Sequence, residues 1–303
     1  MKPRGREAQP DEVLVGAWQD AGMIRIDAHR HLWDIDARPQ PWMTGRYAPM
    51  ARSFLSDDYA AVALPCGVRS SVVVQSVSDT AETDELLALS AIDPFIGGVV
   101  GWVDLTKPDV SDQLQRFRAN LGGEHLVGIR HQVHDEPDVD WLARPAVRRG
   151  LAAVGENGLS YDLLIRTEHL EVASDTARTV HGTHFVIDHA AKPPIEHGDL
   201  EPWRTGIRAL AALPNVSCKL SGLVTEASWE TWTPADLRPW VDTVLDAFGP
   251  ERTMVGSDWP LCTLACAFDV SLDVYGVLLA GLSRSDQDAL HAGTAQRVYG
   301  LPS

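Results

Sequence analysis

The sequence is poor in cysteine and lacks several short motifs, and each absence excludes a class of protein. Its four cysteines include no Cys-x-x-Cys pair, which argues against a structural zinc site. We expect Cys262 and Cys266 to be small buried residues rather than a disulfide. The absence of Gly-x-Gly-x-x-Gly, Gly-x-x-x-x-Gly-Lys and Gly-x-Ser-x-Gly argues against dinucleotide binding, P-loop chemistry and serine-hydrolase chemistry.

Basic residues and long apolar runs are also scarce. The 26 Lys and Arg residues against 42 Asp and Glu give a formal net charge of −16, so nucleic acid and anionic membranes, both polyanions, are not expected partners. No run approaches the ~18 consecutive apolar residues that span a bilayer. Residues 1–22 lack the apolar core of a secretory signal, so the cytoplasm is the expected location.

Short apolar runs alternate along the chain with segments of helical spacing or composition. The eight runs lie at 23–33, 69–77, 95–105, 125–133, 158–166, 183–190, 215–223 and 252–260. The helical segments include 83–91, 110–121, 145–156, 167–180, 201–212 and 234–248. Strands separated by helices require crossover connections and hence a parallel sheet. Eight of them at this length predict an α/β protein with a closed (β/α)8 TIM barrel.

The domain organisation follows from the same pattern. We expect residues 23–303 to form one barrel domain and residues 1–22 to be a partly mobile N-terminal extension, with a short helix over 11–21. Residues 34–65 are rich in proline and glycine. We expect them to form an extended loop on the face where barrel active sites are built.

The strongest local signal for a site is His29-Arg30-His31 at the end of the first run. Residues i and i+2 of a strand point the same way, so both imidazoles would face the barrel mouth. Two imidazoles can bind a metal or donate hydrogen bonds to an oxyanion. The alternative is a pair of surface histidines in a loop, and the preceding apolar run with Asp27 favours the site.

Polar side chains also follow or end several later runs. They are Arg130, His131, His134, Asp188, His189, Lys219 and Asp258. Catalytic residues of (β/α)8 enzymes come from the ends of several strands, so these side chains are expected to converge. A carboxylate close to such cationic and imidazole side chains can act as a general base, because burial and neighbouring cations shift its pKa in opposite directions. Trp33, Trp102 and Trp259 also follow strands and can wall a pocket against the apolar face of a sugar ring.

Seven ordered segments carry a resemblance to a known family. They read IDAHRHLW, VVGWVDL, GIRHQVHDEPD, YDLLIR, VIDHAAKPP, CKLSGLVTEA and GSDWPLC. In this order they resemble the sugar-lactone hydrolases of the amidohydrolase superfamily, the branch of L-fuconolactonases and L-rhamnonolactonases that is related to the pyrone-dicarboxylate lactonases. The resemblance covers about residues 23–301. It implies an amidohydrolase-like barrel and a small-molecule lactone substrate.

The resemblance also implies roles for the strand-end residues. Asp258 would be the general base, and His29, His31 and His189 would surround the reacting carbonyl. The candidates to bind the substrate or wall its pocket are Arg130, His131, His134, Lys219, Trp33, Trp102 and Trp259.

The sequence departs from the metal-dependent members of the superfamily. These often place a histidine on the fifth strand and a bridging lysine on the fourth, where this chain has Tyr161-Asp162 and Arg130-His131. A binuclear centre is therefore not expected. The residues that can hold one divalent ion, such as zinc, are His29, His31, His189 and Asp258. Metal-free catalysis also occurs in this branch, so we expect no cofactor to be required.

The predicted function is hydrolysis of the 1,4- or 1,5-lactone of an aldonic acid. A pyrone-dicarboxylate lactonase would need several cations for two carboxylates, and the strand ends offer mainly Arg130 and Lys219. A metal-dependent decarboxylase is a third reading. A barrel that binds sugar acids without turnover would not need the general base Asp258. A homo-oligomer is compatible with all of these readings.

Overall fold

Eight parallel strands form the centre of the computed structural model, which describes residues 24–302. The expected extension 1–22 and its helix lie outside these residues. The strands are β1 (Arg25–Arg30), β2 (Val68–Val74), β3 (Ile96–Gly101), β4 (Leu126–His131), β5 (Ser160–Leu163), β6 (His184–Ile187), β7 (Val216–Leu220) and β8 (Thr253–Val255). Each strand pairs with the next in chain order. A bridge between Arg30 and Trp259 joins the two ends of the sheet, so the predicted TIM barrel is confirmed.

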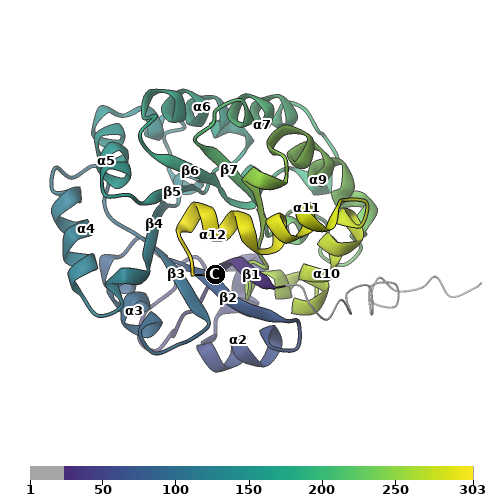
Figure 1. The fold of residues 1–303 in the computed structure, drawn as a ribbon, viewed down its shortest axis with the longest axis horizontal. Coiled ribbons are helices and arrows are strands. Elements are labelled where there is room, and N and C mark those ends of the chain that lie inside the picture. Colours follow the sequence, from purple (N-terminus) through teal and green to yellow (C-terminus); the bar gives the residue numbers. More distant parts are fainter. Residues whose placement is uncertain (1–23, 303) are drawn as a thin grey trace, which may run out of the picture.

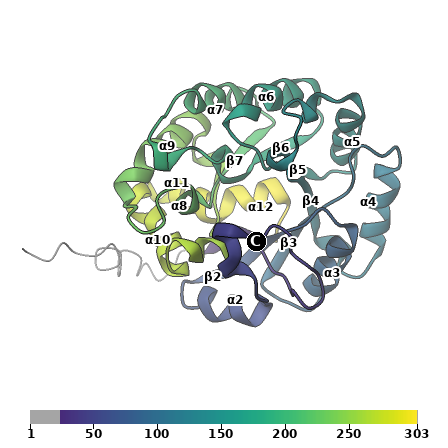
Figure 2. The same cartoon turned by 180° about the vertical axis from the view of Figure 1, so that it is seen from behind.

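Helices surround the barrel in the order of the chain (Figures 1 and 2). They are α2 (Ser56–Ala63), α3 (Thr80–Ser90), α4 (Val110–Ala119), α5 (Pro145–Glu156), α6 (Leu170–Thr179), α7 (Trp203–Ala211), α8 (Leu223–Glu226), α9 (Pro234–Phe248), α10 (Phe268–Leu279), α11 (Arg284–Asp288) and α12 (Thr294–Tyr299). Most of these helices lie on the outer face of the strands and bury their apolar sides there. None of the described helices is long and apolar enough to cross a membrane.

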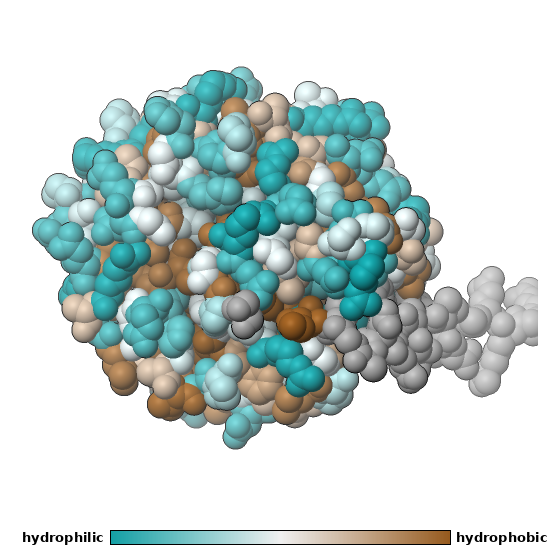
Figure 3. All heavy atoms as spheres, viewed as in Figure 1, coloured by the Kyte–Doolittle hydropathy of each residue, from teal (hydrophilic) through white to brown (hydrophobic). Residues whose placement is uncertain are grey.

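The C-terminal helix α12 lies across the N-terminal end of the barrel (Figure 1). Its Ala295 and Tyr299 are buried in one cluster with Val72, Val100 and Met254, whose side chains fill the barrel interior. The space-filling view of the same face shows hydrophilic and hydrophobic residues side by side over its surface (Figure 3). The C-terminal end of the strands, on the opposite face, is therefore the end that can hold a site.

Two local expectations are wrong. Residues 34–65 are not a loop throughout, because a 3-10 turn at Gly45–Met50 and helix α2 lie within them. Asp57 and Asp58 lie in the first turn of α2, where their negative charges interact favourably with the positive end of the helix dipole. Helix α3 starts at Thr80 rather than residue 83, since the Asp79 side chain accepts a hydrogen bond from the Ala81 amide and caps it. Cys262 is buried and is not joined to Cys266 by a disulfide, as expected, but Cys266 is only half-buried.

A buried carboxylate at the barrel seam fixes the loop that follows β8. The two oxygens of Asp27 accept hydrogen bonds from the amide and hydroxyl of Ser257, at 2.8 and 2.5 Å, and from the Tyr59 hydroxyl at 3.0 Å. The Asp258 amide in turn donates to the His29 carbonyl at 2.8 Å. These bonds set the position of Asp258 relative to the end of β1.

Candidate active site

A cavity of about 840 Å³ opens at the C-terminal end of the strands. Its floor is formed by strand-end side chains, and the loop between β1 and α2 forms part of its wall. The lining residues that the sequence predicted are His31, Arg130, His131, His134, His189 and Asp258. The size suits a substrate of a few ring atoms with several polar substituents.

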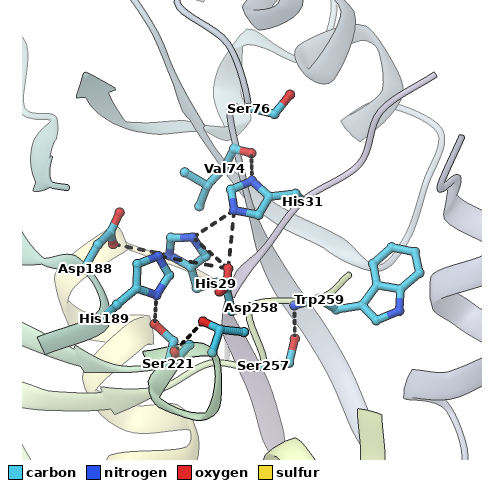
Figure 4. A network of polar contacts seen from close by, with 12 residues as sticks. His29, His31, Val74, Ser76, Asp188, His189, Ser221, Ser257, Asp258 and Trp259 are labelled. Carbon is cyan, nitrogen blue, oxygen red and sulfur yellow. Dashed lines mark hydrogen bonds and ion pairs between the residues drawn. The ribbon is translucent and has the colours of Figure 1, made fainter. Parts of the chain in front are cut away.

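Three imidazoles surround one carboxylate oxygen at the base of this cavity (Figure 4). His31 and His189 line the cavity, whereas His29 is fully buried beneath its lining. Oδ1 of Asp258 lies 3.5 Å from Nε2 of His31, 3.8 Å from Nε2 of His29 and 4.0 Å from Nε2 of His189. These separations are longer than normal hydrogen bonds. The atoms therefore face a common centre instead of saturating one another, and the predicted convergence of strand-end residues is observed.

The backbone places two of these residues through unusual conformations. His189 begins a turn in which four successive residues, through Lys192, have positive φ angles between 48° and 62°. The left-handed region costs non-glycine residues about 1–2 kcal/mol each. A hydrogen bond of 2.7 Å from the Trp203 indole to the Ala190 carbonyl holds the turn. Asp258 is also left-handed, with φ of 58°. Such strain is typical of functional sites, because only a well-packed surrounding maintains it.

Burial and neighbouring charges set the protonation of the site. Burial lowers the pKa of His29 and of His189 well below the ordinary value, so both are neutral near pH 7. Burial alone would raise the pKa of Asp258, but His189, His31 and Lys192 together hold that pKa below its ordinary value. The Nδ1 atom of His31 lies 2.7 Å from the Val74 carbonyl, which can only accept a hydrogen. In its neutral form His31 therefore carries its proton on Nδ1 and points a bare Nε2 into the site.

The same atoms fit a single divalent cation. Ligand atoms of His29, His189 and Asp258 all lie within 4.8 Å of one another, and Nε2 of His31 lies 3.2 Å from Nε2 of His29. Zinc–ligand bonds of about 2.0–2.2 Å in a tetrahedron place the donor atoms roughly 3.3–3.6 Å apart. Imidazole nitrogen and carboxylate oxygen are also the donors that zinc prefers. Within residues 24–302 no second cluster of this kind was found.

Lys219 does not line the cavity, although the sequence suggested it as a substrate-binding residue. Its ammonium is fully buried below the floor, 2.6 Å from Asp162 and 3.0 Å from Asp188. A cation already occupies the space between these two carboxylates. This gives a structural reason why a second divalent ion is not expected there.

The tryptophans proposed as pocket walls lie elsewhere. Trp33 and Trp259 are buried in the core, where both rings pack against Phe54. Trp102 lies behind His131, to which its indole donates a hydrogen bond of 2.9 Å. The aromatic residues that line the cavity are Trp42 and Tyr47, from the loop between β1 and α2. His134 and His131 line the cavity as predicted.

Three cations of the cavity wall were not singled out from the sequence: Arg38, Arg166 and Lys192. Lys192 ends the left-handed turn, and its ammonium lies 2.7 Å from Glu226. Arg38 pairs with Asp79 and with Glu85. Lys192 lies in the segment VIDHAAKPP, which is one of the seven segments that carry the family resemblance. The spacing of residues in this segment does not show that a left-handed turn directs the Lys192 side chain into the site.

Comparison with known proteins identifies the family. The amidohydrolase family profile matches residues 26–301. L-fucono-1,5-lactonases of Burkholderia multivorans and Burkholderia ambifaria are 40% and 37% identical to the chain, over 93% and 91% of its length and 97% and 93% of their own. A crystal structure of an amidohydrolase from Burkholderia multivorans with bound zinc has a TM-score of 0.86 and 37% identity, and the match covers 92% of this chain and 100% of that one. The chain therefore belongs to the amidohydrolase family, as its sequence motifs predicted.

Proposed function

We propose that the protein hydrolyses the lactone of a six-carbon aldonic acid, with L-fucono-1,5-lactone as the first substrate to test. The observation that carries the proposal is one ionised carboxylate, Asp258, facing three imidazoles at the floor of a polar cavity. Two relatives of this chain with matching length are L-fucono-1,5-lactonases, which supports the choice of substrate. The proposed partner is thus a small molecule.

In the proposed reaction, water attacks the lactone carbonyl carbon and Asp258 takes its proton. The carbonyl oxygen becomes an oxyanion, to which imidazole N–H groups of His29 or His189 donate hydrogen bonds. The bond to the ring oxygen then breaks, and Asp258 returns the proton to that oxygen as it becomes a hydroxyl. The product is an open-chain hydroxy acid, which releases one proton to solution near neutral pH.

A divalent ion bound by His29, His31, His189 and Asp258 would polarise the lactone carbonyl as a Lewis acid. The zinc-bound relative supports such a site. With the ion bound, Nε2 of His29 and of His189 would be ligands and could not donate hydrogen bonds, so the ion would serve the oxyanion in their place, while Asp258 and the cavity wall keep their roles.

The charges of the cavity count against a dicarboxylate substrate. Arg38 is paired with Asp79 and Glu85, Arg130 with Asp188, and Lys192 with Glu226. These three cations are already neutralised, so of the lysines and arginines that line the cavity only Arg166 adds positive charge for two substrate carboxylates. Neutral sugar lactones need hydrogen-bond donors and acceptors instead, and the paired side chains supply both.

The experiment that tests the function is a substrate panel followed by proton release. Purified protein is given six-carbon aldono-1,5-lactones, a pyrone dicarboxylate and aromatic carboxylic acids. Release of protons with the aldonolactones alone supports the proposal. Turnover of the pyrone dicarboxylate or loss of carbon dioxide from an acid would replace it, and binding without turnover would leave a sugar-acid-binding protein.

Removal of metal is expected to have a small effect. A lactone has an alcohol leaving group and is more reactive than an amide, so the histidine donors can serve the oxyanion unaided. We predict at most one divalent ion per chain and a fall in kcat/KM of less than about tenfold after chelation, well below the 10²–10³-fold loss of an essential oxyanion donor. Elemental analysis with assays before and after chelation measures both. Two ions per chain, with activity strictly following metal content, would refute the prediction.

Replacing Lys192 with methionine is expected to lower kcat/KM by about 10–100-fold, because a hydrogen bond to a charged group contributes about 1.5–3 kcal/mol. Methionine keeps most of the side-chain length and removes the donors that line the cavity. Lys107→Met, at an exposed position, is the matched control. Because Glu226 loses its partner, thermal unfolding and the Lys192→Met/Glu226→Gln double variant check folding. Unchanged kcat/KM in a folded variant would exclude Lys192 from the site.

The pH profile is expected to be a plateau from about pH 6 upward. The lowered pKa of Asp258 keeps its carboxylate ionised there, and the lowered pKa values of His29 and His189, caused first by burial, keep both imidazoles neutral. Burial would lower the pKa of Lys192, but Glu226 holds that pKa above its ordinary value, so the cation persists. A kcat/KM profile measured to about pH 9 tests this. A tenfold fall on the alkaline side would indicate that a cationic histidine is required.

A further inference from the structure

A row of hydrogen bonds in the cavity wall ends on a carboxylate that the proposed reaction does not use. His131 is the last residue of β4, and Glu136 comes directly after the 3-10 turn Val133–Asp135. The Trp102 indole donates to Nδ1 of His131 at 2.9 Å. Nε2 of His131 lies 2.8 Å from Oε1 of Glu136. Both His131 and Glu136 line the cavity.

The direction of these hydrogen bonds follows from the indole. An indole N–H can only donate, so Nδ1 of His131 accepts and carries no hydrogen. The proton of a neutral His131 then lies on Nε2, and the Glu136 carboxylate accepts it. The His131 ring also stacks on Trp141, with ring centroids 4.4 Å apart and 11° between the planes. Trp102 and Trp141 together fix the imidazole, and the imidazole fixes Oε1 of Glu136.

This arrangement leaves a carboxylate oxygen, and not the imidazole, available to a ligand. Both ring nitrogens of His131 are occupied, although the sequence suggested His131 as a substrate-binding residue. Oε2 of Glu136 makes no hydrogen bond or ion pair with any residue of the described range 24–302. The polar group that this part of the wall offers to a substrate is therefore Oε2 of Glu136.

The chemistry of a carboxylate limits what it can bind. A carboxylate oxygen accepts hydrogen bonds and cannot donate them. A hydroxyl group suits it, since a hydrogen bond to an ionised acceptor is roughly twice as strong as one between neutral groups. A carboxylate of the substrate would instead be repelled by its like charge. The Glu136 carboxylate therefore fits an uncharged ring that carries hydroxyl groups.

We propose that Glu136 is a specificity-determining residue that accepts a hydrogen bond from a hydroxyl of the lactone, and that His131 is a positioning residue that acts through Glu136. The proposal rests on the proposed lactonase function, because it concerns another group of the same substrate. It narrows the substrate class to lactones that keep a free hydroxyl on a carbon outside the ester. Glu136 moves no proton in the reaction, so it affects which lactones are hydrolysed and leaves the chemistry of the ester unchanged.

Replacing Glu136 with methionine removes the acceptor and keeps most of the side-chain length. We expect kcat/KM for a six-carbon aldonolactone to fall by about 10–100-fold, as for the loss of a hydrogen bond to a charged group. The value for valerolactone, which has no hydroxyl, should stay at that of wild type. Glu156→Met, at an exposed position on α5, is the matched control and should change neither value. Equal losses for both lactones would indicate a structural role and overturn the proposal, and so would no loss for either.

Lactones that each lack one hydroxyl identify the group that Glu136 binds. For one of them, wild-type kcat/KM should already be lowered by a factor similar to that of the Glu136→Met change. The Glu136→Met variant should lower it no further, because the partner is absent from the substrate. If the variant lowered kcat/KM equally for every one of these lactones, no hydroxyl would be its partner and the proposal would be wrong.

A double-variant comparison tests the positioning role of His131. His131→Phe keeps a ring against Trp141 and removes both nitrogens. If His131 acts through Glu136, the His131→Phe/Glu136→Met protein should have the same kcat/KM as Glu136→Met alone. Thermal unfolding checks that each protein is folded. Losses that add in a folded double variant would show that His131 contacts the substrate itself and would overturn its positioning role.

Binding of the cyclic sugar that corresponds to the lactone gives a readout without turnover. This sugar carries the same hydroxyls and has a lactol in place of the ester, so it cannot be hydrolysed. We expect calorimetry to show a Kd about 10–100-fold higher in Glu136→Met than in wild type and Glu156→Met. An unchanged Kd, or no binding of the sugar by wild type, would overturn the proposal. Failure of the lactonase function would appear separately, as absence of turnover with every lactone.

Discussion

Replacing Asp258 with asparagine is expected to lower turnover of the lactone by at least ~10²-fold, which is the usual loss when a general base is removed. Asparagine has nearly the same shape and is one of the few residues that tolerate a positive φ, so the left-handed backbone at this position can persist. The change removes the proton acceptor and leaves the three surrounding imidazoles in place.

The Asp258→Asn variant is compared with wild type in steady-state assays and in thermal unfolding. We expect kcat to fall while the melting temperature stays close to that of wild type. Asp112→Asn, an exposed carboxylate on α4, is the matched control and should be fully active. Near-normal turnover in the Asp258→Asn variant would remove Asp258 from the role of base.

Discrimination between sugar lactones and plain lactones is expected to be larger still. The cavity is lined by histidines, arginines, glutamine and serines that can bind several hydroxyl groups. A site built to hydrogen-bond a hydroxyl rejects analogues that lack it by on the order of 10⁴-fold, because its buried polar groups are left unpaired. We predict that kcat/KM for a six-carbon aldonolactone exceeds that for valerolactone by at least ~10³-fold.

The comparison uses both lactones at equal enzyme concentration, with the spontaneous rate subtracted. Equal kcat/KM values would make the cavity a general esterase site. The proposal that the substrate is a sugar lactone would then be wrong, even if the barrel fold and the role of Asp258 were correct.

The barrel and the floor of the site could be predicted from the sequence, and the reasons are physical. Buried parallel strands are apolar on both faces, so they stand out as short runs between helices. The period of two along a strand puts His29 and His31 on one side, and both are found beside Asp258. The polar ends of β4, β6 and β8 meet at one mouth because the strands are parallel.

The depth at which a side chain lies along the barrel axis could not be predicted from the sequence in this way. Lys219 lies within a strand, and the sequence pattern does not say whether its ammonium reaches the cavity or stays beneath it. The partner Asp162 is 57 residues away, and their contact depends on the shape of the closed barrel. The tryptophans that follow strands illustrate the same limit, since Trp33 and Trp259 turn into the core.

The local backbone conformation was the second feature that the sequence did not predict. The positive φ angles from His189 to Lys192 are carried by residues other than glycine, so nothing in the composition of the turn announces them. That turn delivers Lys192 to the cavity wall. In the segment 34–65 the prolines and glycines concealed helix α2, whose start is marked by Asp57 and Asp58.

Hydrolysis in water labelled with oxygen-18, under single-turnover conditions with enzyme in excess over L-fucono-1,5-lactone, tests the central claim most directly. If Asp258 activates water for attack on the carbonyl, the first product formed carries one labelled oxygen in its carboxylate and the protein carries none. If Asp258 instead attacked the carbonyl itself, and water then opened the resulting anhydride at the Asp258 carbon, the first product would be unlabelled and the label would appear in the Asp258 carboxylate. That result, or the absence of any enzyme-dependent product, would contradict the account.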